Sequence, residues 1–187
     1  MDEKLSSVTT KQDLIDYTTT EWDALVAYVD GLTADQWTSP KDAAGWSVKD
    51  HVTHVTQWDR AVIELLRNGG PMQETLGISE TAWSAGSYDP MNEEVRRLAV
   101  TDSVHRVKAE RDAIWIDLVS LMSELSEEQL ARPGAKVGLA IGETTRCPRG
   151  VIYSAAKPVL QVLVDYWGAH YSEHLRSIRA IVGGEPA

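Results

Sequence analysis

Four long stretches of the chain repeat their apolar residues at helical spacing, and no stretch alternates them as a half-buried strand would. This pattern predicts an all-α fold, a four-helix bundle in a single domain over residues 1–187. The sequence leaves room for a break in the third helix near Thr101 and Asp102. The expected helices cover about 10–30, 47–68, 92–124 and a last segment that starts between Ser154 and Pro158 and ends at Gly183.

The expected helix starts carry capping residues. Thr10 and Asp13 have the spacing of a capping box, and Ser47 and Asp50 have the same spacing. The third helix starts after a proline, with Asn92 as its expected N-cap. These local signals indicate where the first three helices begin.

A weak internal repeat relates the first and third helices at a constant offset of 93 residues. Trp22 corresponds to Trp115, and each copy ends in a Leu-[Ser/Thr]-x-x-Gln turn, at 32–36 and 125–129. The repeat predicts a bundle of two pseudo-symmetric halves. Chance similarity is the alternative, because core helices share Leu, Val and Trp in any case.

Two long loops are expected, at about 69–91 and 131–153. Loops of this length in a compact domain are usually functional or disordered. Arg146 and Arg149 of the second loop could bind a carboxylate, although solvated loop arginines are the more common case. Cys147 lies between them without a histidine or helix start nearby, so it is not assigned a role.

Charge and composition narrow the classes of partner. The formal net charge of −10 argues against nucleic acid and against anionic membranes, which attract basic surfaces. A small-molecule substrate is the expected partner. The first ten residues contain no apolar signal segment, no stretch is long and apolar enough to span a membrane, and the one cysteine suits a reducing compartment. We therefore expect a cytoplasmic protein.

Three histidines have the placement of a metal site. His170 and His174 lie four residues apart on the apolar face of the last helix, and His54 lies on the second helix. Three neutral imidazoles without a fourth protein ligand describe an open site that can also bind water or a substrate atom. Core histidines bonded to the backbone are the alternative interpretation.

The remaining histidines compete less well as ligands. His51, three residues before His54, is expected at the surface or in support of a ligand, and His105 is expected at the surface. Asp50 could orient the ring of His54, although its position in the capping box explains it equally well.

The segment Trp46-Ser-Val-Lys-Asp-His-Val-Thr-His54 resembles the second-helix motif of the DinB/YfiT-like superfamily, in which a ligand histidine follows the tryptophan by eight residues. His170-x-x-x-His174 resembles the last-helix motif of the same group. The resemblance extends from about residue 11 to 182. It implies a four-helix bundle, often dimeric, with a divalent metal ion, commonly zinc or nickel, on His54, His170 and His174.

Superfamily members of known activity use low-molecular-weight thiols such as mycothiol or bacillithiol. The resemblance therefore implies a thiol-dependent S-transferase, isomerase or detoxification enzyme with a thiol as cosubstrate, and a homodimer as the expected assembly. A metal-dependent small hydrolase is one alternative, because a divalent ion can also activate water. A non-catalytic protein that binds a metal or small ligand under stress is the other.

Overall fold

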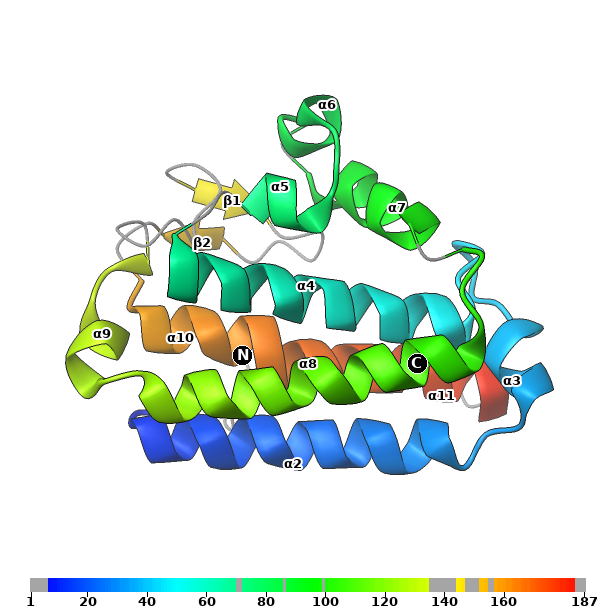
Figure 1. Cartoon of the computed structure of the whole chain (residues 1–187), viewed down its shortest axis with the longest axis horizontal. Helices are drawn as coiled ribbons and strands as arrows, with labels where there is room; N and C mark the ends of the chain where they lie inside the picture. Colours follow the sequence, from blue (N-terminus) through cyan, green and yellow to red (C-terminus); the bar gives the residue numbers. More distant parts are fainter. Residues whose placement is uncertain are drawn as a thin grey trace.

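The structure is a computed structural model that describes residues 7–69, 72–85, 87–98, 100–134, 144–146, 152–154 and 157–183. Its main body is a bundle of four long helical segments, which confirms the predicted all-α class (Figure 1). Three of them are continuous helices: α2 (Lys11–Asp30), α4 (Val48–Asn68) and α8 (Val104–Glu124). The fourth consists of α10 (Val159–Val164), the π-helical turn η2 (Asp165–Ala169) and α11 (His170–Gly183).

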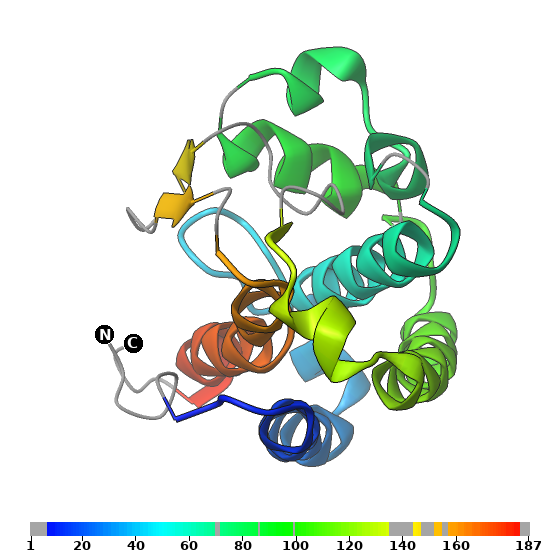
Figure 2. The same ribbon diagram turned by 90° about the vertical axis from the view of Figure 1, so that its left-hand side faces the viewer.

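The four segments surround one core. Seen from the end in Figure 2, α2, α8, α4 and the last segment follow one another around the bundle. Figure 1 shows that α4 and α8 run in the same direction, opposite to α2 and the last segment. A chain that leaves α4 must therefore return along the bundle before α8 can begin.

That return contains three helices, which corrects the prediction of a loop at 69–91. They are α5 (Met72–Leu76), α6 (Glu80–Trp83) and α7 (Tyr88–Leu98). The predicted third helix is two helices, with the break falling close to Thr101 and Asp102. Asn92 lies inside α7 and is not its N-cap, since Pro90 fits the first turn, where no N–H bond is lost. Helices of four or five residues are too short to give a periodic pattern.

The predicted capping boxes are present at the starts of α2 and α4. The hydroxyls of Thr10 and Ser47 accept from the N–H groups of Asp13 and Asp50, whose carboxylates accept from the cap backbone in return. At its other end α4 closes on Gly69 with φ of 69°, a left-handed conformation that glycine adopts without strain.

Both copies of the internal repeat form the same local structure. After α2 the chain makes α3 (Ala34–Thr38), and after α8 it makes α9 (Glu127–Ala131). Each short helix starts with a complete capping box, Thr33 with Gln36 and Ser126 with Gln129. The repeat is thus a structural one, a long helix followed by a short capped helix.

The expected loop at 131–153 is described only in part. Strands β1 (Thr144–Arg146) and β2 (Ile152–Ser154) form a small antiparallel hairpin, whereas the sequence predicted no strand. Three residues are too few for alternation to be visible in a sequence. Arg146 lies in β1, while Cys147 and Arg149 lie outside the described residues.

Candidate metal centre

The first turns of α4 supply two buried histidines. The Ser47 cap fixes where the helix starts, so that His51 and His54, three residues apart, both face inward. They are 4% and 2% exposed. The carboxylate of Asp50 accepts from the N–H of Ser47 at 2.9 Å and from its hydroxyl at 2.7 Å. The capping role predicted for Asp50 is therefore confirmed.

The last segment supplies the other two histidines directly after its π-helical turn. Such a turn holds one more residue than an α-helical turn and often occurs at functional sites. It also brings the backbone at Gly168 against α2, since a Cβ there would lie 2.4 Å from the Tyr17 ring. His170 and His174 follow, one turn apart on the face toward α4.

The predicted three-histidine cluster is present in the structure. Nε2 of His170 lies 3.0 Å from Nε2 of His54 and 3.0 Å from Nε2 of His174. One nitrogen from each ring belongs to a group whose members all lie within 4.8 Å of one another. Sequence positions 54, 170 and 174 thus meet at one point between two antiparallel helices.

Hydrogen bonding alone cannot satisfy these three nitrogens. An imidazole nitrogen carries either one proton or one lone pair, so Nε2 of His170 can form one good bond and yet has two nitrogen neighbours. A tetrahedral ion about 2.0–2.1 Å from each donor spaces its ligands by about 3.3 Å. The two spacings of 3.0 Å to Nε2 of His170 are close to that value, so the donor set suits a divalent ion.

Burial keeps two of the rings neutral. The pKa of His54 is well below its usual value, first because the ring is buried and then because His170 and His51 lie close. Burial also lowers the pKa of His170 to about 4, against an opposing effect of the Tyr166 carbonyl. Neutral imidazole is the form that binds metal ions.

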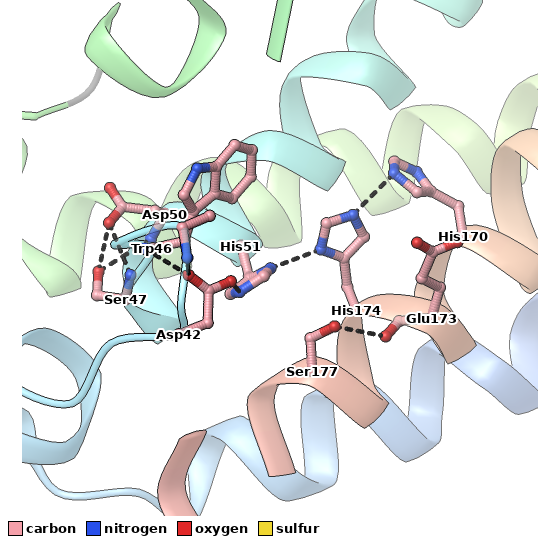
Figure 3. A network of polar contacts seen from close by, with 10 residues as sticks. Asp42, Trp46, Ser47, Asp50, His51, His170, Glu173, His174 and Ser177 are labelled. Atoms are coloured by element: carbon pink, nitrogen blue, oxygen red, sulfur yellow. Dashed lines mark hydrogen bonds and ion pairs between the residues drawn. The ribbon is translucent and has the colours of Figure 1, made fainter. Parts of the chain in front are cut away.

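His51 supports the cluster from outside (Figure 3). Its Nδ1 lies 2.8 Å from Nδ1 of His174, and its Nε2 lies 3.3 Å from a carboxylate oxygen of Asp42. Burial lowers the pKa of His51, and Asp42 partly offsets that effect. His51 is buried against His174 and does not lie at the surface, whereas His105 is exposed on α8 as predicted. Sequence reasoning missed Asp42, which lies in the loop before α4 and not at helical spacing.

Aromatic rings cover the α4 side of the cluster. The Trp46 ring lies 5.3 Å from the ring of His51 and 5.2 Å from that of His54. Trp58 lies 6.1 Å from the ring of His54 and donates its indole N–H to Asn92 of α7 at 3.3 Å. His54 and His174 are buried and His170 is half-buried, so the cluster is most accessible from the side of His170.

Two hollows of about 310 and 540 Å³ lie elsewhere, along the face of α4 that turns toward α8. Arg60 lines both of them, and none of the histidines lines either. Their walls are largely polar and charged, but among the described residues only the histidine cluster groups three side chains that could hold a metal ion. Among the helices that the structure describes, none is long and apolar enough to cross a membrane.

Fold and site together place the chain among four-helix bundles that carry a histidine donor set between two helices. The sequence model of the DinB superfamily matches residues 17–178, and the chain belongs to that superfamily. The resemblance noted in the two histidine motifs is therefore confirmed.

Several solved structures share the fold. An uncharacterised protein from Escherichia coli UTI89 has a TM-score of 0.70 at 13% identity, over 96% of each chain. The colibactin self-resistance protein ClbS, in complex with double-stranded DNA, has a TM-score of 0.64 at 13% identity, over 94% of this chain and 97% of its own. A protein from Streptococcus pneumoniae has a TM-score of 0.61 at 14% identity, over 93% of this chain and 92% of its own. Among curated proteins no relative matches.

Proposed function

We propose that His54, His170 and His174 bind one divalent ion, zinc or nickel, and that the site acts as a thiol-dependent S-transferase, isomerase or detoxification enzyme on a small molecule. The observation that carries this proposal is the Nε2 atom of His170, which has two nitrogen neighbours at 3.0 Å and can bond only one of them. Membership of the DinB superfamily supports the same donor set.

The chain's own donors favour an anionic partner. Imidazole ligands carry no negative charge, so they would leave the positive charge of a bound divalent ion uncompensated, and an anionic substrate group would complement it. A bound divalent ion would lower the pKa of a thiol or of water and so provide a nucleophile at neutral pH. Trp46 and Trp58 shield the His54 side from water, which leaves the half-buried His170 side for substrate entry.

Metal binding is tested with chain purified without a histidine tag. After exposure to zinc or nickel and removal of free ions, elemental analysis should find one ion per chain. Ala substitutions at His54, His170 or His174 should abolish that content. His105→Ala is the matched control, because His105 is exposed on α8, and it should retain the ion. A wild-type chain that stays free of metal after both exposures would end the proposal.

The reaction type is tested by separating thiol from water. The metal-loaded chain is assayed with an electrophilic substrate, with and without a low-molecular-weight thiol. Turnover that needs the thiol supports transfer or isomerisation, and turnover without it supports the alternative of a small hydrolase. Stoichiometric metal that is lost in His54→Ala, with no turnover in either arm of the assay, supports a non-catalytic binding protein.

Partners and setting are part of the proposal. The net charge of −10 favours a small-molecule substrate over nucleic acid. The DNA bound to ClbS counts against excluding nucleic acid on net charge alone, so a binding measurement with duplex DNA belongs beside the enzyme assay. A homodimer and a cytoplasmic location remain predictions, and sedimentation of the purified chain tests the first.

A further inference from the structure

Asp42 and His51 form a chain of contacts that leads away from the histidine cluster. Nδ1 of His51 lies 2.8 Å from Nδ1 of His174, and Nε2 of His51 lies 3.3 Å from a carboxylate oxygen of Asp42 (Figure 3). His51 is 4% exposed, so water cannot replace either contact freely. Neither residue belongs to the proposed ligand set.

The positions of the protons in this series of contacts follow from the two groups at its ends, Nε2 of His174 and the carboxylate of Asp42. If Nε2 of His174 is a metal ligand, it carries a lone pair, and the ring proton must be on Nδ1. That N–H then donates to Nδ1 of His51, which in turn must carry its own proton on Nε2. Nε2 of His51 lies 3.3 Å from a carboxylate oxygen of Asp42, outside hydrogen-bond geometry, so the contact is electrostatic and favours the proton on that nitrogen.

We propose that Asp42 and His51 are positioning residues that hold His174 in the Nδ1–H tautomer and so keep its Nε2 available as a donor. The inference rests on the proposed metal site and adds the two residues that set the tautomer of one proposed ligand, His174. Partners of this kind commonly orient metal-binding histidines and increase their basicity.

The loop before α4 is built to present Asp42. Its second carboxylate oxygen accepts from the N–H of Ala44 at 2.9 Å and of Trp46 at 2.8 Å. The Asp42 N–H donates to the Trp46 carbonyl at 2.9 Å, and Gly45 takes the positive φ of 83° that the turn requires. With one oxygen held by the turn, the other is left facing His51.

A purely structural role gives the opposite order of effects for two substitutions. If Asp42 only closes its loop, Asp42→Asn should be mild, because an amide oxygen still accepts from the two N–H groups, and Asp42→Ala should be worse. If Asp42 selects a tautomer, Asp42→Asn should be the worse variant. Its amide can donate to Nε2 of His51, which moves the proton to Nδ1 of His51 and forces the Nε2–H tautomer on His174.

The test measures zinc affinity by competition with a chelator for wild type, Asp42→Asn and Asp42→Ala. We expect Asp42→Asn to bind zinc about 10–100-fold more weakly than wild type and more weakly than Asp42→Ala. Nitrogen-15 NMR of the metal-free chains gives a second readout. It should find Nδ1 of His174 protonated in wild type and Nε2 protonated in Asp42→Asn. Circular dichroism checks that each variant is folded.

The outcomes separate the two proposals. A wild-type chain that binds neither zinc nor nickel removes the proposed metal site and this inference with it, and a chain that binds only nickel is tested by the same competition with nickel. A wild-type chain that binds zinc, with Asp42→Asn equal to wild type or no weaker than Asp42→Ala, overturns the inference alone. An unchanged His174 tautomer in a folded Asp42→Asn chain also overturns it.

Discussion

Asp59 of α4 lies in the interior of the bundle, where it is 1% exposed. One carboxylate oxygen accepts from the Tyr171 hydroxyl at 2.8 Å, while the other has no hydrogen-bond partner among the described residues. Burial raises the pKa of Asp59 well above its usual value, and the bond from Tyr171 offsets only part of that rise. The folded protein therefore holds a proton on Asp59 at pH values where the unfolded chain has released it.

That raised pKa predicts how stability depends on pH. The unfolded chain releases the Asp59 proton above about pH 4, so the free energy of unfolding should fall as the pH rises from there through the folded-state pKa. Asp59→Asn should remove this fall, because an amide accepts from Tyr171 without ionising. The variant should be more stable than wild type at neutral pH, by about 1.4 kcal/mol for each unit of the shift.

Urea unfolding at a series of pH values checks the Asp59→Asn prediction. Asp23→Asn on the exposed side of α2 is the control and should follow the wild-type curve. Parallel curves for wild type and Asp59→Asn would mean that Asp59 ionises normally in the folded state.

At the scale of elements, the π-helical turn η2 determines how closely the last segment approaches α2. A Cβ at position 168 would lie 2.4 and 2.6 Å from two carbons of the Tyr17 ring, well inside van der Waals contact. Glycine is therefore needed here for space. His170 begins α11 two residues later, so this contact lies next to the histidine cluster.

Gly168→Ala should destabilise the chain by about 1–3 kcal/mol, because the added methyl forces the Tyr17 ring or the helix to move. Thermal and urea unfolding measure the loss. Combining it with Tyr17→Leu should recover part of that loss, since the clash is with the ring.

Gly31→Ala is the matched control for Gly168→Ala. Gly31 has φ of −76°, and a Cβ there would lie 3.5 Å from the Tyr28 carbonyl oxygen, an ordinary van der Waals contact. Gly31→Ala should therefore change the free energy of unfolding only slightly. A Gly168→Ala chain as stable as Gly31→Ala would contradict the close packing of η2 on α2.

At the scale of the whole molecule, the two copies of the repeat meet through their corresponding tryptophans. Trp22 of α2 and Trp115 of α8 stack with centroids 4.6 Å apart and planes 9° from parallel. The Trp22 ring also meets Tyr171 edge-on at 5.3 Å. This stack joins the two halves of the bundle beside the segment that carries His170.

A double-mutant cycle on Trp22→Leu and Trp115→Leu should give a coupling of about 0.5–1.5 kcal/mol in unfolding free energy, the usual contribution of an aromatic pair. The cycle of Trp22→Leu with Trp83→Leu, on the separate helix α6, should give a coupling near zero. Equal couplings in both cycles would show that the stack adds nothing specific.

Local patterns were enough to predict the long helices and the three-histidine cluster. The apolar spacing of α4 and α11 and the four-residue separation of His170 and His174 are visible in the sequence, because a helix fixes which residues share a face. The starts of α2 and α4 were also predictable, because each carries a capping box that is visible in the sequence.

The remaining features depend on contacts between distant parts of the chain. Helices α5 and α6 are too short to show a period, and their positions depend on how the return from α4 to α8 packs. Asp42 reaches His51 only through the turn at Gly45, and burial of Asp59 depends on Tyr171, 112 residues away. No spacing rule connects such residues.

The bond between the rings of His54 and His170 spans 116 positions, most of the length of the chain. The donors meet only where α4 and the last segment are packed side by side. An ion on the proposed site would therefore bind only the completed bundle. Each tenfold rise of free ion above its dissociation constant would then add about 1.4 kcal/mol to the stability of the whole domain.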